Sequence, residues 1–171
     1  KGTDDFLTQS CMQWENSYQQ IQTLSAKSCI IRIGVVLSKD GGALKRLLPL
    51  FHLGLGSAVG SGKQYMPWIH IEDLVSVFYE ALFNSNYTGI YNAVSIEETT
   101  SNSFSKHLAK SLSKPFFLPR VPAFALKLVF GEMANVLLEG SRVSNKKLVN
   151  EGFQFKYPTL SEALREIISK K

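Results

Sequence analysis

Three side chains that combine an aromatic ring with a polar atom stand close together in the segment 64–71. They are Tyr65, Trp68 and His70, and apolar residues separate them. Such side chains often line small-molecule pockets, where the ring packs on the ligand and the polar atom fixes its orientation. The alternative for His70 is a structural histidine, because no carboxylate or cysteine stands at metal-ligand spacing from it. The segment therefore predicts one wall of a pocket.

Arg32 interrupts an apolar run that extends from residue 29 to residue 37. A charge inside a buried strand is unfavourable unless it is paired or faces a cleft. Two interpretations stay open. One is a structural ion pair with Glu15 or Asp73. The other is an anion clamp at the carboxyl end of the strand, where open α/β sheets bind their ligands.

Four glycines from Gly54 to Gly62 raise the question of a phosphate-binding loop. A P-loop needs serine or threonine after its lysine, but Gln64 follows Lys63. The glycine spacing also resembles a dinucleotide fingerprint, which needs a strand before it and a helix after it. Here a helical pattern precedes and a strand pattern follows, so we expect these glycines to shape turns.

The usual catalytic motifs are absent from this sequence. There is no Tyr-x-x-x-Lys, no Gly-x-Ser-x-Gly and no His-Glu-x-x-His, and Cys11 and Cys29 have no metal-binding spacing.

The net charge is +5, but the basic residues are scattered, so we predict no nucleic-acid partner. No apolar run reaches the roughly 18 residues of a membrane-spanning helix. Both cysteines lie in apolar patterns, which favours buried thiols and an intracellular compartment, cytoplasmic or organellar.

Apolar periodicity divides the chain into alternating helices and strands, which predicts an α/β fold. A helical stripe covers residues 4–24. The apolar run at 29–37 indicates a strand that is buried on both faces of a parallel sheet. We expect a hairpin around the glycines, with a second strand at about 64–71. Further patterns predict a strand at 89–94 and helices at 44–51, 72–83, 101–112, 122–130, 133–138, 146–150 and 160–168.

One segment resembles the epimerase-family proteins of the atypical extended short-chain dehydrogenase/reductase superfamily. It is Gly-Ser-Gly-Lys-Gln-Tyr-Met-Pro-Trp-Ile-His-Ile-Glu-Asp-Leu at 60–74. Supporting stretches are Arg-Ile-Gly-Val-Val-Leu at 32–37, Leu-Glu-Gly-Ser-Arg-Val at 138–143 and Glu-Gly-Phe-Gln-Phe at 151–155. The resemblance covers the whole chain. It implies the C-terminal part of a Rossmann-like NAD(P)-binding fold with a hairpin insertion at 1–98, and a small mixed α/β substrate-side domain at 99–171.

The resemblance also implies a function. A complete protein of this kind would bind NADP and act as an oxidoreductase or nucleotide-sugar epimerase. The glycine-rich cofactor turn belongs to an N-terminal half that we expect to precede this chain, so we predict no cofactor site and no activity for the chain by itself. The residues that would bind a small, nucleotide-sugar-like substrate are Arg32, Lys63, Tyr65, Trp68 and His70, with Arg142 as a further candidate.

The alternative is a relative that kept the fold and lost the chemistry, as a non-catalytic NADP-binding or partner-binding protein. Members of the superfamily carry Tyr-x-x-x-Lys on the helix that enters the sixth strand. The tyrosine transfers a proton during hydride transfer, and the lysine lowers its pKa. Leu7 and Cys11 stand at the matching positions here. The catalytic residues and the oligomeric state therefore stay open.

Four of the candidate residues are predicted to share one cavity near the carboxyl end of the strand at 29–37: Arg32, Tyr65, Trp68 and His70. Ligands of open α/β sheets lie beyond the carboxyl ends of the strands, and residues two apart on a strand share a face. Trp68 and His70 would therefore point the same way. Tyr65 lies on the opposite face unless Pro67 resets the alternation.

Overall fold

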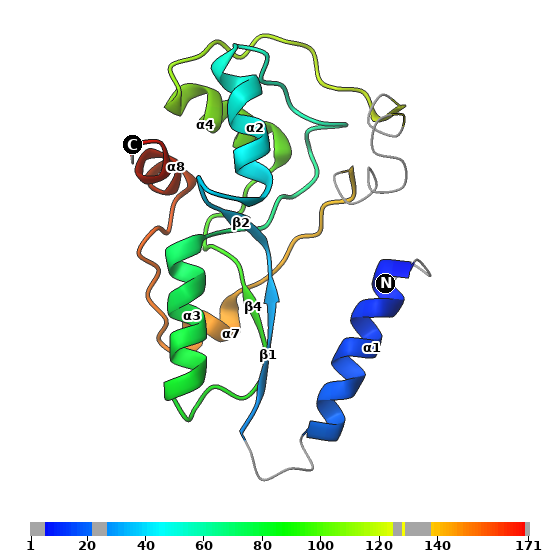
Figure 1. Ribbon diagram of the computed structural model, residues 1–171, viewed down its shortest axis with the longest axis vertical. Coiled ribbons are helices and arrows are strands. Elements are labelled where there is room, and N and C mark those ends of the chain that lie inside the picture. Colours follow the sequence, from blue (N-terminus) through cyan, green and yellow to red (C-terminus); the bar gives the residue numbers. More distant parts are fainter. Residues whose placement is uncertain (1–5, 22–26, 125–127, 129–137, 170–171) are drawn as a thin grey trace.

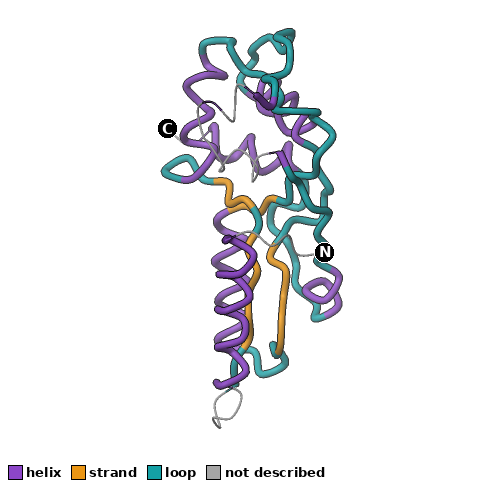
Figure 2. Tube along the Cα trace, turned by 90° about the vertical axis from the view of Figure 1, so that its right-hand side faces the viewer, coloured by secondary structure: helices purple, strands orange, loops and turns teal. Residues whose placement is uncertain are grey.

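The chain folds into an α/β structure in which helices flank two short pairs of parallel strands (Figure 1, Figure 2). This computed structural model describes residues 6–21, 27–124, 128 and 138–169. The predicted α/β class is confirmed, whereas the helices predicted at 122–130 and 133–138 lie largely outside the described residues. The helices include α1 (Phe6–Ile21), α2 (Gly42–His52), α3 (Ile71–Phe83), α4 (Ser101–Ser111), α7 (Lys146–Asn150) and α8 (Leu160–Ser169), and the strands are β1 (Cys29–Ile33), β2 (Val35–Leu37), β3 (Trp68–His70) and β4 (Gly89–Ala93).

Gly34 divides the predicted strand at 29–37 into two strands with different partners. β1 pairs with β4 and β2 pairs with β3, both in parallel. The amide of Gly34 donates to the Ala93 carbonyl at 3.2 Å, whereas the next amide, of Val35, donates to the Pro67 carbonyl at 2.8 Å. The predicted parallel pairing is confirmed, and one bent segment serves both pairs.

No side chain fits at Gly34 without movement of its neighbours. A Cβ there would lie 2.8 Å from the Pro67 carbonyl oxygen and 2.9 Å from Cγ1 of Val94. We expect Gly34→Ala to lower the free energy of unfolding by about 1–3 kcal/mol, because packed neighbours must shift to admit the methyl group. Gly41→Ala is the matched control, since its Cβ would meet no atom within 4 Å. Urea unfolding followed by circular dichroism measures both, and equal midpoints would contradict the close-packing argument.

The predicted hairpin before β3 is wrong. β3 runs parallel to β2, because α2 and the loop after it return the chain to the end of the sheet where β2 begins. Gly54, Gly60 and Gly62 in that loop have φ values of 75°, 56° and 70°, so the glycines do shape turns, as predicted. The strand expected at 64–71 shortens to Trp68–His70, and Pro67 precedes it.

Two apolar cores lie on opposite faces of β3. Trp68 belongs to the first core and Ile69 to the second, as alternation along a strand requires. The first core joins α2, α4 and α8, and the second joins α3, β4 and α7. Each core therefore takes residues from both sides of the boundary expected after residue 98, and that boundary stays a prediction. The side chains that α8 buries share one helical face: Leu160, Ala163, Leu164 and Ile167.

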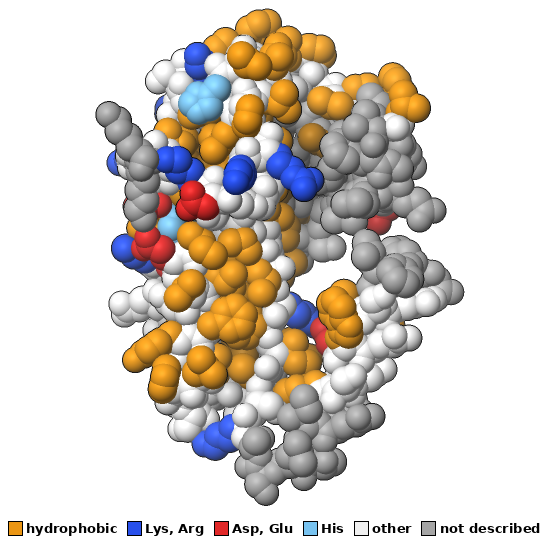
Figure 3. Space-filling view, viewed as in Figure 1, with side chains coloured by type: hydrophobic (Ala, Val, Ile, Leu, Met, Phe, Trp, Pro, Cys, Tyr) orange, Lys and Arg blue, Asp and Glu red, His pale blue; other side chains and the backbone are white. Residues whose placement is uncertain are grey.

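β1 and α3 carry apolar side chains that stay exposed in the described part of the chain. Among the described residues β1 has β4 as its one partner, and Ile33 is 48% exposed. The prediction that the strand at 29–37 is buried on both faces is therefore wrong for β1. Figure 3 shows apolar side chains gathered over α3. The exposed apolar side chains of this helix are Ile71, Val75, Phe78, Tyr79, Leu82 and Phe83.

α1 lies beside β1, on the side away from α3 (Figure 1). The hydroxyl of Tyr18 donates to the Ser28 carbonyl at 2.7 Å, which ties the end of the helix to the start of the strand. The predicted helix is confirmed, but Cys11 and Trp14 on its apolar stripe are exposed, and Cys29 is half-buried. The prediction of two buried thiols is wrong, because the stripe of α1 that carries Cys11 is exposed and β1, which carries Cys29, has one strand partner among the described residues.

Candidate functional site

Trp68 and His70 are the most deeply buried of the candidate residues. Both lie on β3 and are 1% exposed. Nε1 of Trp68 donates to Oγ1 of Thr99 at 3.0 Å. The side chains lie two positions apart on one face of the strand, but Trp68 borders one cavity and His70 another.

Tyr65, Trp68 and Arg142 border a narrow crevice just beyond the carboxyl end of β4. Its volume is about 20 Å³, and residues between 94 and 99, which follow β4, form another wall. Cζ of Arg142 lies 5.9 Å from the centre of the Tyr65 ring. Nε of Arg142 donates to both carboxylate oxygens of Glu98, each at 2.8 Å. The crevice therefore has an exposed guanidinium at its rim, at the strand ends where open α/β sheets bind ligands.

The Arg142 guanidinium suits recognition of an anion. Its pKa is raised above the ordinary value by the hydrogen bond and the charge of Glu98. A planar guanidinium matches carboxylates and phosphates and can stack on an aromatic ring, here that of Tyr65. An anionic group can thus replace Glu98 as the partner of Arg142. A crevice of this volume holds little more than one water, so a larger ligand would lie across its rim.

Tyr65 reaches the same crevice as Trp68 because the chain between them is not a regular strand. Pro67 precedes β3, and Tyr65 forms an isolated antiparallel bridge with Thr100. Gly140 packs directly on the backbone of Tyr65, where a Cβ would overlap the Tyr65 carbonyl. This close approach brings the segment that carries Arg142 to the crevice.

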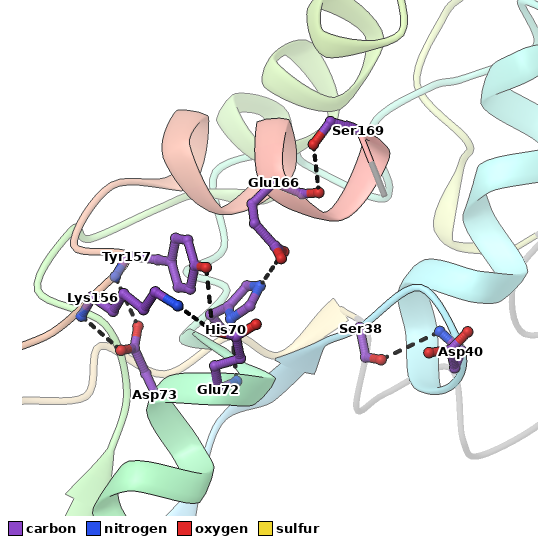
Figure 4. A network of polar contacts seen from close by, with 9 residues as sticks. All are labelled: Ser38, Asp40, His70, Glu72, Asp73, Lys156, Tyr157, Glu166 and Ser169. Carbon is purple, nitrogen blue, oxygen red and sulfur yellow. Dashed lines mark hydrogen bonds and ion pairs between the residues drawn. The ribbon is translucent and has the colours of Figure 1, made fainter. Parts of the chain in front are cut away.

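His70 lies between β3 and α8 in a network of polar contacts (Figure 4). Its Nδ1 accepts from the Glu72 amide at 3.2 Å and caps the N-terminus of α3. An accepting Nδ1 leaves the proton on Nε2, which lies 2.9 Å from Oε2 of Glu166 and donates to it. The Tyr157 ring packs on the imidazole with 3.9 Å between centroids. Both ring nitrogens therefore have hydrogen-bond partners within the protein, which agrees with the structural histidine considered from the sequence.

Glu72 and Asp73 hold the segment that leads into α8. The buried carboxylate of Asp73 accepts from the amides of Lys156 at 2.7 Å and Tyr157 at 3.1 Å. Glu72 accepts from Nζ of Lys156 at 2.7 Å and raises the pKa of that lysine, chiefly through this hydrogen bond. Carboxylates in the first turn of α3 also suit the positive end of the helix. These contacts fix α8 over the end of β3.

A second cavity, of about 390 Å³, lies at the carboxyl ends of β2 and β3. It is lined by residues 38–40 after β2, by His70 and Ile71, and by Glu166 and Ile167 of α8. Figure 4 shows Ser38 and Asp40 on the loop after β2, across from His70 and Glu166. The volume lies in the range of small-ligand sites. The cavity is therefore a second position for a small molecule, with the His70–Glu166 pair in its wall.

Arg32 lies away from both cavities. Its Nε and Nη2 donate to the two carboxylate oxygens of Glu15 on α1, each at 2.6 Å. The hydrogen bond lowers the pKa of Glu15, and the structural ion pair considered from the sequence is confirmed. Lys63 is exposed in the loop before β3, where its amide donates to Oγ of Ser61 at 3.1 Å.

The prediction that four candidate residues converge on one cavity is wrong in the described part of the chain. Gly34 separates β1 from β2, so Arg32 belongs to a different strand pair from Trp68 and His70. The structure brings Tyr65, Trp68 and Arg142 together and places His70 at the neighbouring cavity. A substrate contact by Lys63 stays a prediction.

The residues that the structure describes contain no group of three or more histidine, cysteine, aspartate or glutamate side chains that could hold a metal ion. None of the helices formed by these residues is both long and apolar enough to cross a membrane.

Glu98 and Glu166 complete the two cavities, and sequence reasoning did not single them out. Glu166 adjoins Ile167 at the edge of the buried face of α8, so the amphipathic pattern marks it as a boundary position. Glu98 follows the strand at 89–94, where the rule on strand ends draws attention to polar residues. Both patterns are visible in the sequence, but neither predicts which residue the carboxylate contacts.

Comparison with known proteins shows close relatives over almost the whole chain. Residues 121–167 match a family described as a domain of unknown function, DUF1731. The Arabidopsis thaliana protein "Epimerase family protein SDR39U1 homolog, chloroplastic" is 42% identical over 164 residues, which are 96% of this chain and 47% of that protein. The Mus musculus "Epimerase family protein SDR39U1" is 37% identical over 169 residues, 98% of this chain and 57% of that protein. The chain thus spans about half the length of the curated relatives it matches.

Solved structures share the same fold. The crystal structure of human epimerase family protein SDR39U1 (isoform 2) with NADPH matches with a TM-score of 0.90 and 34% identity, over 98% of this chain and 56% of that chain. The nucleoside-diphosphate sugar epimerase from Corynebacterium glutamicum matches with a TM-score of 0.74 and 25% identity, over 98% of this chain and 32% of that chain. The predicted fold, the C-terminal part of a Rossmann-like NAD(P)-binding protein, is confirmed.

Proposed function

This chain belongs to the epimerase family of the extended short-chain dehydrogenase/reductase superfamily, and we propose that it forms the substrate side of an NADP-dependent oxidoreductase or nucleotide-sugar epimerase. NADP is bound mainly by the half of the relatives' length that this chain does not span, and the chain by itself is inactive. The NADPH in the structure of the human relative supports this choice of cofactor. The substrate is a small molecule with an anionic group, and the protein acts inside the cell.

The arrangement of Arg142, Tyr65 and Glu98 carries this proposal. Three segments that are far apart in the sequence place an exposed guanidinium against an aromatic ring at the carboxyl end of β4. Glu98 neutralises the guanidinium until an anion takes its place. The phosphate groups of a nucleotide sugar have the charge and geometry for that exchange. The ring of Tyr65 keeps the guanidinium in position during the exchange.

A non-catalytic NADP-binding or partner-binding protein is the second candidate function. The observation that favours it is the missing Tyr-x-x-x-Lys, because Leu7 and Cys11 occupy the matching positions on α1. Neither side chain reproduces a tyrosine whose proton is released with the help of a lysine. The two functions differ in turnover of a bound nucleotide sugar. An oxidoreductase consumes NADPH, which absorbance measures, whereas an epimerase returns the hydride to the sugar and changes its configuration, which NMR of the sugar measures.

We expect Arg142→Gln to weaken binding of UDP-glucose about tenfold or more, because the substitution removes a charge-assisted hydrogen bond donor for phosphate. The measurement is calorimetry in the presence of NADP, with this chain fused behind the N-terminal half of a relative. Arg165→Gln on α8 is the matched control, since it removes the same charge from an exposed position outside both cavities. We expect its affinity to equal that of the parent.

Two results would contradict the proposal. Equal affinities of Arg142→Gln and the parent would remove Arg142 from the binding site. An absence of UDP-glucose binding by a folded fusion that binds NADP would exclude this nucleotide sugar as the class of ligand. Circular dichroism of each variant separates loss of binding from loss of folding.

A further inference from the structure

A further cavity lies along α3 and shares no lining residue with the crevice beside Arg142 or the cavity beside His70. It has a volume of about 650 Å³, within the range of small-ligand sites. His70 caps the first turn of α3, and the lining of this cavity begins about one turn later at Val75 and continues along the helix to Asn84. The segment after α7 forms the opposite side of the cavity. Its lining includes Tyr79, Glu80, Asn84, Tyr87, Glu151 and Phe153.

Two carboxylates in this lining have no cationic partner in the described part of the chain. Asn84 Nδ2 donates to Oε2 of Glu80, and Tyr91 donates to Oε1 of Glu151, both at 3.4 Å. These contacts are long, and neither partner is charged. The cavity is therefore negatively charged in a chain whose net charge is +5.

Tyr87 supplies an independent indication of a ligand. It is 3% exposed, and its ring stacks on Tyr91 with 4.9 Å between centroids. Its hydroxyl has no hydrogen-bond partner among the described residues. Burial, followed by the charge of Glu80, raises its pKa to about 12, so the hydroxyl stays neutral at neutral pH. The charge of Glu151 adds to this effect, and both glutamates line the same cavity as Tyr87. The Tyr87 ring is buried while the residue lines the cavity, so a ligand there can donate to the hydroxyl oxygen.

We propose that this cavity binds the ammonium group of a small primary alkylamine. An alkylammonium group has three N–H donors, and the cavity offers three acceptor groups in the Glu80 and Glu151 carboxylates and the Tyr87 oxygen. Tyr79, which is 60% exposed, and Phe153 provide aromatic surface for the alkyl chain and the cation. The same acceptors give no hydrogen bond to a quaternary ammonium and no charge attraction to an alcohol.

The test is a titration of the ¹⁵N-labelled chain with n-pentylamine hydrochloride at neutral pH and constant ionic strength, followed by amide NMR shifts. We expect saturable shifts confined to residues near 79–87 and 151–154. Glu80→Gln combined with Glu151→Gln is expected to raise the dissociation constant about tenfold or more, since both charges disappear while the side-chain volumes remain. Tyr87→Phe is expected to raise it about threefold to tenfold, because one acceptor is lost and the ring stack is kept.

Three controls define the chemistry. Glu139→Gln removes a charge from an exposed carboxylate that does not line the cavity, and its affinity should equal that of the parent. Pentyltrimethylammonium should bind about tenfold more weakly than n-pentylamine, because it cannot donate hydrogen bonds. 1-Pentanol should give no saturable shift. The proposal is overturned if alcohol and amine act alike, if the quaternary ion binds as tightly as the amine, or if the double glutamine variant keeps the parent affinity while folded.

Discussion

Trp68→Ala is expected to lower the free energy of unfolding by about 3–5 kcal/mol, because removal of a large buried side chain leaves a cavity that the core cannot fill. Trp68 is among the largest fully buried side chains in the described part of the chain. It packs in the first core, to which α2, α4 and α8 contribute. Its indole N–H also donates to Thr99, so the substitution removes a buried hydrogen bond as well.

Two further variants separate these contributions. Trp68→Phe keeps most of the apolar volume and is expected to lose about 1–3 kcal/mol. Thr99→Val leaves the indole N–H without its partner and is expected to lose about 1–3 kcal/mol. Urea unfolding followed by far-ultraviolet circular dichroism measures all three variants. A midpoint for Trp68→Ala equal to that of the parent would show that Trp68 is a pocket side chain and not a core side chain.

The helices that the structure describes could be predicted closely from the sequence, because each is a local pattern. The stripe of α8 gave residues 160–168, and the helix is Leu160–Ser169. The pattern of α3 gave residues 72–83, and the helix is Ile71–Phe83. The strand pairing was harder to predict. Apolar alternation shows that a segment is extended, but it does not show which strand lies beside it or in which direction, so β3 was expected in a hairpin.

The bend at Gly34 had a similar cause. A continuous apolar run looks like one strand, and the change of partner depends on Pro67 and Ala93, which lie far along the chain. Arg32 was therefore expected near Trp68, whereas the structure places it beside Glu15 on another strand pair. The residue types show that Arg32 is unusual in its segment, but the pairing of the strands decides where its side chain lies.

The candidate site was predictable only where its residues lie in one short segment of the chain. Tyr65 and Trp68 stand out as polar aromatic residues in one short segment, and the structure places both at one crevice. Arg142 was suggested by the resemblance alone, since its partner Glu98 is 44 residues away. His70 and Glu166 are 96 residues apart, and no local pattern connects them.

Asp73→Ala is expected to lower the free energy of unfolding by about 2–4 kcal/mol, because it leaves two backbone amides without acceptors. Asp73 is 1% exposed and accepts from the amides of Lys156 and Tyr157 at 2.7 and 3.1 Å. These residues lead into α8, whose apolar face fills the first core. Loss of the carboxylate therefore loosens the segment that holds Tyr157 against His70, so the cavity beside Glu166 changes together with the stability.

Asp73→Asn and Glu72→Gln are the matched variants for this contact. Asparagine keeps one carbonyl oxygen as an acceptor, so Asp73→Asn should lose less stability than Asp73→Ala. Glu72 binds the exposed ammonium of Lys156, and Glu72→Gln should change the free energy of unfolding by less than about 1 kcal/mol. Urea unfolding gives the three values, and hydrogen exchange of the Lys156 and Tyr157 amides locates the effect. Faster exchange of these two amides in Asp73→Ala than in Glu72→Gln is the expected result, and equal exchange would show that Asp73 does not hold the segment.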